Sequence, residues 1–224
     1  MSSILELQKV TKTYYLRSET IHVLNGIDLQ IEQGSFVVVL GPSGSGKSTL
    51  LNIMGSLDGP TSGKVFLDSS ELSSYSDRAL SEIRNRKIGF VFQFHHLLSE
   101  FTCVENIALP GLVNGGSPRV VYEKAASLLE RLGMADKQNR LPEQLSGGEK
   151  QRVAIARSLI NDPLIILADE PTGNLDEENT NKLLDIFVNL KAEGGTVVLV
   201  THAVDIAKKG TDVYNLKEGT LYAM

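Results

Sequence analysis

Apolar and polar residues alternate at the start of the chain with the two-residue period of β-strands. The pattern covers ILELQKV (4–10), IHVLNGIDLQI (21–31) and SFVVVLG (35–41), which polar turns separate, and it returns in KVFLD (64–68). These segments predict strands, because β-branched and aromatic residues favour that conformation. Short helices are expected over 47–54 and 80–86.

Near-continuous apolar runs characterise the second half, in PLIILADE (163–170) and TVVLVTH (196–202), and KIGFVFQ (87–93) resembles them. Such runs are typical of parallel strands that are covered on both faces. An amphipathic helix is predicted over 177–193, with two glycines as its stop. The tail over 212–224 is predicted to form a closing hairpin. The fold class is therefore α/β, with an antiparallel β-rich edge.

The segment between these two parts has a helical pattern instead. In VVYEKAASLLERLGM (120–134), Ala125, Leu128, Leu129 and Leu132 fall on one helix face. Another helix is expected to begin at Ser146 and to stop before residue 161. We therefore predict one domain over 1–224, with a core of 1–93 and 162–224 and an inserted α-helical subdomain over 94–161.

Composition and charge narrow the function. The 224 residues carry a formal net charge of −5, which argues against a broad basic surface for nucleic acid. Cys103 is the only cysteine, so no intrachain disulfide can form, and a buried apolar role is favoured over a redox thiol. No apolar run approaches the ~20 residues of a membrane helix. We expect a cytoplasmic protein that reaches a membrane through a partner.

The clearest chemical motif is GPSGSGKST, which matches G-x-x-x-x-G-K-[ST], follows a predicted strand and opens a helix. Its backbone N–H groups are expected to surround phosphate oxygens, Lys47 to reach the β- and γ-phosphates, and the Ser48 hydroxyl to bind Mg²⁺. The alternative is a surface turn rich in glycine and serine. The predicted nucleotide-binding residues are Gly41, Pro42, Ser43, Gly44, Ser45, Gly46, Lys47, Ser48 and Thr49.

Polar residues follow three other predicted strands, and the carboxyl ends of parallel strands meet at one edge of a sheet. Asp169 and Gln93 are predicted to join Ser48 as Mg²⁺ ligands. Glu170 is predicted to polarise the attacking water, and His202 to bind Glu170 and a γ-phosphate oxygen. The alternative for Asp169 and Glu170 is a pair of solvent-exposed acids at a strand end. The alternative for His202 is a histidine that only forms structural hydrogen bonds at a strand end.

LSGGEKQ (145–151) resembles a second phosphate-facing helix start, but it has no lysine. Ser146 and Glu149 form the S-x-x-E pattern of a capping box. Two glycines in a first turn cost about 1 kcal/mol each relative to alanine. They make sense if phosphates approach this backbone closely, and the first loop already serves the chain's own nucleotide. The second site is therefore expected to serve the nucleotide of a second copy.

Together these motifs, in this order and spacing, resemble the ATP-binding-cassette (ABC) ATPases. The resemblance implies a P-loop NTPase (RecA-like) core that binds ATP and Mg²⁺ in a head-to-tail dimer. Tyr14 would stack on adenine, with Tyr15 as the second choice, and Asn174 and Asp176 would lie at the dimer seam. Ala203 departs from the aspartate common after the switch histidine. The signature residues facing the partner's ATP would be Ser146, Gly147, Gly148 and Glu149.

A narrower resemblance concerns DEPTGNLD (169–176) and QFHHLLSEFTCVENIALP (93–110). The first is typical of the group that includes LolD, MacB and FtsE, and the second is most similar to LolD. This implies an ATPase that powers lipoprotein release with LolC/LolE-like membrane subunits. MacB-like efflux or FtsE-like division is the alternative. The expected membrane-subunit contacts, in the groove that receives the coupling helix, are Phe94, His95, His96, Leu97 and Leu98.

Two more distant classes are also considered. A non-transport ABC protein of DNA repair or chromosome organisation would need a long coiled coil, zinc cysteines or a basic surface. A P-loop kinase or a GTPase would leave LSGGEKQ unexplained, and no N-K-x-D guanine motif is present.

Overall fold

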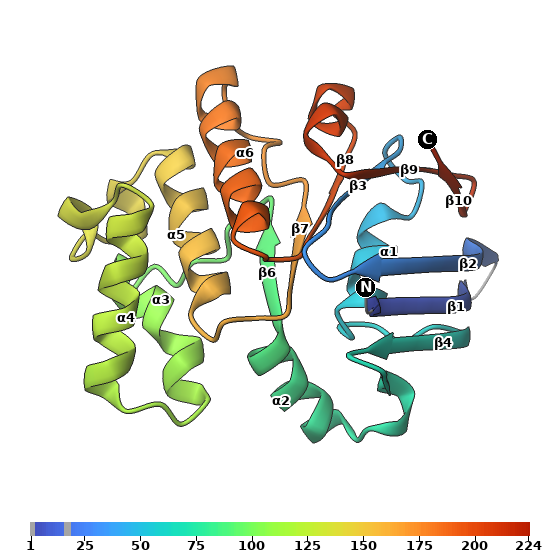
Figure 1. Ribbon diagram of the computed structural model, residues 1–224, viewed down its shortest axis with the longest axis horizontal. Helices are drawn as coiled ribbons and strands as arrows, with labels where there is room; N and C mark the ends of the chain where they lie inside the picture. The colour runs from blue at the N-terminus through green and yellow to red at the C-terminus, as the bar shows by residue number, and fades with distance from the viewer. Residues whose placement is uncertain (1–2, 16–18) are drawn as a thin grey trace.

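The computed structural model describes residues 3–15 and 19–224, and within these ranges the strands form two sheets (Figure 1). The first sheet is antiparallel, in the order β2-β1-β4-β5. Its strands are β1 (Ser3–Tyr15), β2 (Thr20–Glu32), β4 (Ser62–Leu67) and β5 (Ser70–Glu71).

The second sheet has the order β10-β9-β3-β8-β7-β6. Its strands are β3 (Phe36–Leu40), β6 (Ile88–Phe92), β7 (Ile165–Asp169), β8 (Val197–Thr201), β9 (Asp212–Lys217) and β10 (Thr220–Ala223). All neighbours pair in parallel except β9 and β10, which form the predicted closing hairpin.

Helices cover both faces of this second sheet. The helices are α1 (Lys47–Met54), α2 (Asp77–Lys87), α3 (Cys103–Val113), α4 (Pro118–Arg131), α5 (Gly147–Leu159) and α6 (Glu177–Ala192). Short 3-10 turns are η1 (Leu72–Ser74), η2 (Ala135–Lys137), η3 (Pro142–Gln144) and η4 (Val204–Lys209).

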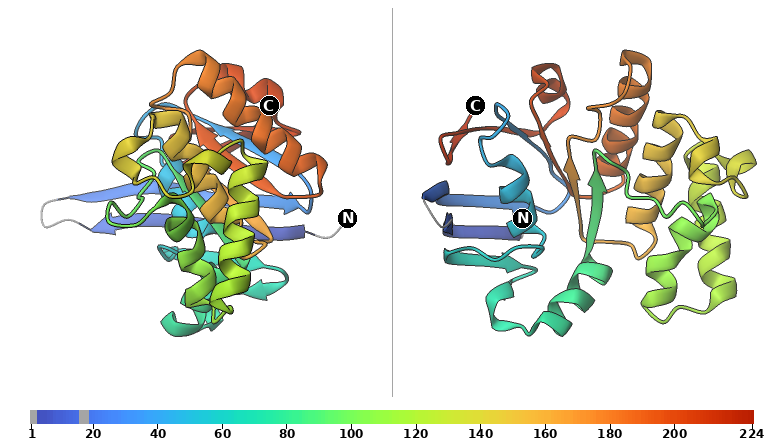
Figure 2. Two further views of the ribbon diagram at one scale, coloured as in Figure 1. Left: turned by 90° about the vertical axis from the view of Figure 1, so that its left-hand side faces the viewer. Right: turned by 180° about the vertical axis from the view of Figure 1, so that it is seen from behind.

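Successive residues of β3 belong to different hydrophobic clusters, which explains the near-continuous apolar runs. Val37 and Val39 pack in one cluster with α1, whereas Phe36 and Val38 pack in another with α5 and α6. Alternate residues of a strand point to opposite faces. Helix α1 therefore lies on one face of the sheet and helices α5 and α6 lie on the other, as Figure 2 shows from two sides. The antiparallel sheet covers α1 from outside, so that α1 is enclosed between two sheets.

Helices α3, α4 and α5 share a hydrophobic cluster of their own. Ala125 and Leu129, which lie on the predicted apolar face, are fully buried there. Cys103 is also buried, and its Sγ donates to the carbonyl oxygen of Arg140 at 3.2 Å. Burial raises the pKa of the Cys103 thiol, as expected for a small apolar side chain of the core.

Helix bounds follow local capping closely. Helix α1 covers the predicted residues, but the prediction that α2 begins at Leu80 is wrong. That helix starts at Asp77 because the Ser76 hydroxyl accepts a hydrogen bond from the Ala79 N–H. Within the described ranges, none of the helices is both long and apolar enough to cross a membrane.

Candidate functional site

Sheet register brings the predicted site residues to one edge of the second sheet. Phe92 pairs with Asp169, Asp169 with Val200, and Leu40 with Thr201. The strands β6, β7, β8 and β3 therefore end side by side. The residues that follow them along the chain must meet at this edge.

The loop that follows β3 depends on glycine. Gly44 and Gly46 have φ angles of +80° and +101°, which favour glycine over other residues. A Cβ atom on Gly46 would lie 3.0 Å from Val23 Cγ1, and one on Gly41 would lie 2.6 Å from the Leu216 carbonyl oxygen. The loop then turns into the first helical turn of α1, whose free N–H groups favour an anion.

Lys47 folds back over this loop. Its Nζ donates to the carbonyl oxygens of Gly41 at 2.9 Å and Pro42 at 3.0 Å, and it lies 3.7 Å from Glu170 Oε1. The lysine is 6% exposed. A buried ammonium in this position can form charge-assisted hydrogen bonds to phosphate oxygens.

Glu170 is held by two neighbours from the end of β8. Its Oε2 accepts from Thr201 Oγ1 at 2.9 Å, and its Oε1 lies 3.0 Å from His202 Nδ1. Its backbone has φ +44°, a strained conformation for a residue with a side chain. The predicted contact between His202 and Glu170 is therefore present. Thr201 was not predicted, although it directly precedes His202 in the sequence.

Asp169 and Ser45 carry buried oxygens that lack a partner within the described residues. The atoms are Asp169 Oδ1 and Ser45 Oγ. Burial raises the pKa of Asp169, and a hydrogen bond with Ser48 opposes that rise. An unpaired buried acceptor is costly, and a hard cation would satisfy it. Carboxylate and hydroxyl oxygens therefore fit Mg²⁺.

This metal would need ligands beyond acidic side chains. No group of three or more His, Cys, Asp or Glu able to hold a metal is found in the described part of the chain. Mg²⁺ commonly keeps waters and binds substrate phosphates together with one or two protein oxygens. The pair Ser48 and Asp169 suits that mode.

Gln93 follows β6 and contacts the loop after β7. Its Nε2 donates to Asn174 Oδ1 at 3.5 Å, and a Cβ on Gly173 would lie 2.7 Å from the same nitrogen. The structure thus joins Gln93 to the predicted seam residue Asn174. The other seam residue, Asp176, caps α6 by accepting from the Asn179 N–H at 2.7 Å.

Tyr14 lies beside the end of the phosphate loop. Its hydroxyl donates to Asp58 Oδ2 at 2.9 Å, and Lys12 Nζ lies 4.9 Å from the ring centroid. Burial and the Asp58 carboxylate raise the pKa of Tyr14, whereas a hydrogen bond with Thr49 lowers it. Tyr15 is 75% exposed. Tyr14 thus contacts Thr49 of the phosphate loop, and its stacking on adenine stays a prediction.

The LSGGEKQ segment starts α5 with the predicted capping box. Ser146 Oγ accepts from the Glu149 N–H at 3.3 Å, and Glu149 Oε2 accepts from the Ser146 N–H at 2.8 Å. The second bond lowers the pKa of Glu149. Because α5 and α1 lie on opposite faces of the sheet, this turn is separated from the phosphate loop of its own chain (Figures 1 and 2).

The two glycines of this turn have different surroundings. A Cβ on Gly148 would lie 2.6 Å from Asn179 Oδ1, whereas one on Gly147 would meet nothing closer than 3.7 Å. The interior of the chain therefore accounts for Gly148. Gly147 is exposed, and none of the described residues lies close enough to require a glycine there.

We expect Gly148→Ala to destabilise the fold by roughly 1–3 kcal/mol, because the new methyl group overpacks the contact with α6. Gly147→Ala has room and gains helix propensity, so its stability should equal or exceed that of the wild type. Urea denaturation midpoints of the two variants check this. Equal destabilisation by both changes would contradict the assigned contact.

Helix α5 also holds the segment that follows β6. Arg157 donates to the carbonyl oxygens of His95 at 2.7 Å and His96 at 2.6 Å. Gln151 Nε2 donates to the Phe92 carbonyl oxygen at 3.3 Å. Neither Gln151 nor Arg157 was singled out from the sequence, although Gln151 belongs to LSGGEKQ and is a polar residue at a buried helix position.

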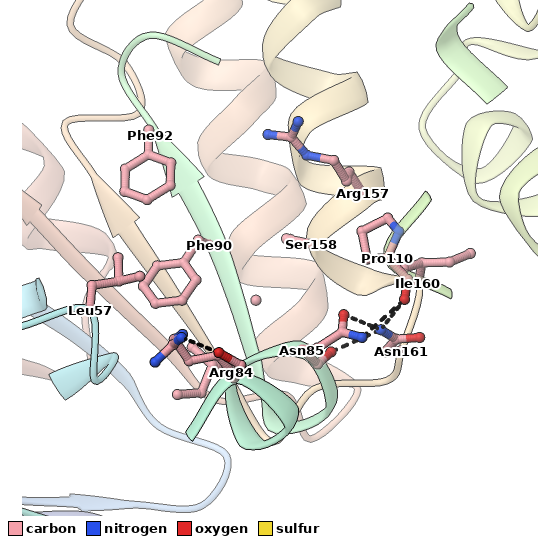
Figure 3. A pocket seen from close by; sticks show the side chains of 13 residues that line it. Leu57, Arg84, Asn85, Phe90, Phe92, Pro110, Arg157, Ser158, Ile160 and Asn161 are labelled. Carbon is pink, nitrogen blue, oxygen red and sulfur yellow. Dashed lines mark hydrogen bonds between the residues drawn. The ribbon is translucent and has the colours of Figure 1, made fainter. Parts of the chain in front are cut away.

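A groove of about 400 Å³ lies where β6, the end of α2 and α5 meet (Figure 3). Phe92 and Arg157 are among its lining residues. Residues 94–98 are not among its lining residues, because that segment turns at His96 (φ +47°) and directs main-chain carbonyls to Arg157. The expected contact of residues 94–98 with a membrane subunit stays a prediction. The lining residues are Leu57, Ser81, Arg84, Asn85, Ile88, Gly89, Phe90, Phe92, Pro110, Arg157, Ser158, Ile160 and Asn161.

The segment itself is partly exposed beside the groove. Phe94 is 69% exposed, and Leu98 is also exposed, whereas Leu97 packs against the cluster of α3, α4 and α5. The His96 ring meets Phe92 edge-on, with ring centroids 5.3 Å apart.

The sequence matches the ABC transporter family over residues 24–173. It is 46% identical over 218 residues to the uncharacterised ABC transporter ATP-binding protein YknY of Bacillus subtilis, covering 97% of this chain and 95% of that protein. It is also 46% identical over 219 residues to the lipoprotein-releasing system ATP-binding protein LolD of Aquifex aeolicus, covering 98% and 96%.

A solved structure extends the likeness to three dimensions. It is the dimeric, post-hydrolysis state of an ATP-binding cassette bound to ADP and Pi. The two structures superpose with a TM-score of 0.91 at 42% sequence identity, covering 98% of this chain and 97% of the other. The predicted fold class, a P-loop NTPase core with an antiparallel β edge and added helices, is thereby confirmed.

Proposed function

This chain belongs to the ABC transporter family, and from that premise we propose that it is the ATP-hydrolysing subunit of a membrane complex that releases lipoproteins. The ATPase activity follows from the family and from the site at the sheet edge. The observation that carries it is the convergence of Lys47, Asp169 and Glu170 at one point. Phosphoryl transfer needs this kind of positioning and charge stabilisation more than covalent chemistry.

In this proposal the loop from Gly41 to Thr49 binds the phosphates of ATP, and Lys47 neutralises the β- and γ-phosphates. Ser48, Gln93 and Asp169 hold Mg²⁺, which supplies charge neutralisation when bound. Glu170 accepts a hydrogen bond from the attacking water and orients it toward the γ-phosphate. His202 and Thr201 keep that carboxylate in place, and Tyr14 stacks on the base.

We further propose that two copies assemble head to tail. The signature turn (Ser146–Glu149) of one copy would face the ATP held by Lys47 of the other, and Asn174 and Asp176 would lie at the seam. Two observations support this: the two phosphate-facing turns lie on opposite faces of the sheet, and the similar solved cassette is a dimer. The helical subdomain over 94–161, which carries the signature turn, would move against the core of 1–93 and 162–224.

The membrane partner would be a LolC/LolE-like permease at the cytoplasmic face of the inner membrane. It would dock on the groove beside Phe92 and Arg157, with residues 94–98 at its rim. Several relatives are named LolD, which favours lipoprotein release. Other relatives, at 46% and 45% identity, are uncharacterised ABC transporter ATP-binding proteins. A MacB-like efflux or FtsE-like division partner is therefore the second candidate.

Pull-down from native membranes in mild detergent tests the partner. Tagged chain should recover membrane subunits with a large extracytoplasmic domain that carry trapped lipoproteins. Recovery of an efflux permease or of division proteins instead would be consistent with the proposed ATPase activity but would contradict the proposed role in lipoprotein release. Recovery of no membrane subunit would contradict the transporter role and point to a soluble ABC ATPase.

A matched pair of variants tests the docking groove. Leu57 lines the groove and is 48% exposed, whereas Tyr222 in β10 is 55% exposed and lies outside it. We expect Leu57→Glu to lower recovery of the membrane subunit about tenfold, because a charge would enter an apolar contact at the interface. Tyr222→Glu should leave recovery unchanged. Equal recovery with both variants would place the partner elsewhere.

A further inference from the structure

The first turns of α5 and α6 meet at the side chain of Asn179. A Cβ on Gly148 would lie 2.6 Å from Asn179 Oδ1 and 2.9 Å from Asn179 Cγ. Gly148 is buried and Asn179 is half-buried. The amide of Asn179 therefore packs directly on the main chain of the signature turn, without a spacer.

Asp176 fixes the orientation of this amide from the opposite side. Asn179 Nδ2 donates to Asp176 Oδ1 at 2.9 Å and to Oδ2 at 3.0 Å, and the Asn179 N–H donates to Oδ1 at 2.7 Å. These bonds lower the pKa of Asp176, which favours its charged carboxylate. With its nitrogen committed to Asp176, the amide turns its oxygen toward Gly148.

We propose that Asn179 is a positioning residue that fixes the signature turn (Ser146–Glu149) relative to the loop of Asn174 and Asp176. This inference rests on the proposed head-to-tail dimer. In that dimer the signature turn faces the partner's nucleotide, so Asn179 acts on the ATP bound by the other copy. In this proposal Asn179 acts through its contact with Gly148 and not by binding the nucleotide.

A purely structural role for Asn179 has a different consequence. If Asn179 only stabilised the start of α6, its loss would impair the chain that carries the change, including that chain's own nucleotide site. A positioning role in trans leaves that site intact. A mixed dimer distinguishes the two roles. A structural role predicts loss of activity at the nucleotide site of the chain that carries the change, whereas a positioning role predicts loss at the nucleotide site of its partner.

The test mixes Lys47→Ala chains with Asn179→Ala chains. Asn179→Ala alone should lower the ATPase rate roughly 10- to 100-fold, because small displacements of a positioning group are costly. Lys47→Ala alone should be inactive. A mixed dimer contains one site with an intact Lys47 and an intact signature turn. Equal mixing should therefore restore about a quarter of the wild-type rate, since half of the dimers are mixed and each has one intact site.

Gly147→Glu supplies the control, because it places a carboxylate on the exposed side of the same turn. If Gly147→Glu restores activity to Lys47→Ala chains and Asn179→Ala does not, the role of Asn179 is overturned and the dimer stands. If neither variant restores activity to Lys47→Ala chains, the result contradicts the head-to-tail dimer and therefore also the proposed role of Asn179. A wild-type rate for Asn179→Ala alone also overturns it. Restored activity shows in addition that the Asn179→Ala chain is folded, since its own Lys47 then works.

Discussion

Glu170→Gln is expected to lower the rate of ATP hydrolysis by roughly 10²–10⁴-fold, the range associated with loss of a general base. The amide keeps the size of the side chain and can still meet Thr201 and His202, whose contacts with Glu170 measure 2.9 and 3.0 Å. It cannot accept the water proton. Steady-state phosphate release from the purified chain measures the loss.

The same variant should accumulate as an ATP-bound dimer, because a closed dimer is opened by hydrolysis in the proposed cycle. Gel filtration with ATP and Mg²⁺ should show twice the monomer mass, and ADP should not. The control is the double change Glu170→Gln with Lys47→Ala, which should stay monomeric. A Glu170→Gln protein that hydrolyses ATP normally would assign the base to another residue. A kinase or a GTPase would give no ATP-dependent dimer.

Lys47→Ala is expected to reduce hydrolysis more than 100-fold, about 2.7 kcal/mol of transition-state stabilisation. The change removes the ammonium that lies between two loop carbonyls and Glu170. Among the described residues, Lys47 is the only lysine or arginine paired with Glu170, so the variant would place the negative charge of a bound phosphate beside an unbalanced carboxylate. Titration with a fluorescent ATP analogue should show weakened binding as well.

Lys64→Ala is the matched control. Lys64 also pairs with a glutamate, Glu71, at 2.8 Å, but that lysine is 55% exposed and lies in the antiparallel sheet. Exposed pairs contribute about 0–1 kcal/mol. Its ATPase rate should stay within about twofold of the wild type. Equal losses in both variants would indicate a general effect of removing lysine.

The features of this site that lie within one turn or one strand could be predicted from the local sequence. The phosphate loop needs glycines at positive φ, and the order of glycines is visible in the sequence. The capping box of Ser146 and Glu149 spans four residues and is equally readable. The meeting of Asp169, Glu170 and His202 follows from one rule, that parallel strands end at the same edge.

Contacts between distant elements could not be predicted in this way. Arg157 donates to the carbonyls of residues 95 and 96, so the path of that segment depends on a partner 62 and 61 residues away in the sequence. Asn179 looks like an ordinary polar residue in the first turn of a helix. Its proposed role depends on its contact with Gly148 of α5, and the two residues are brought together only in the folded chain.

Helix α5 connects the signature turn to the proposed docking groove, so binding at one of these sites can affect binding at the other. Its thirteen residues span about 20 Å, with the signature turn at one end and Arg157 and Ser158 of the groove near the other. Because α5 is one continuous helix, a ligand that shifts one end of it also shifts the other end. Linkage makes such an effect reciprocal. If a partner seated in the groove strengthens closure around ATP by some factor, ATP must tighten the hold on that partner by the same factor, so the cassette would grip its membrane subunit most firmly just before hydrolysis.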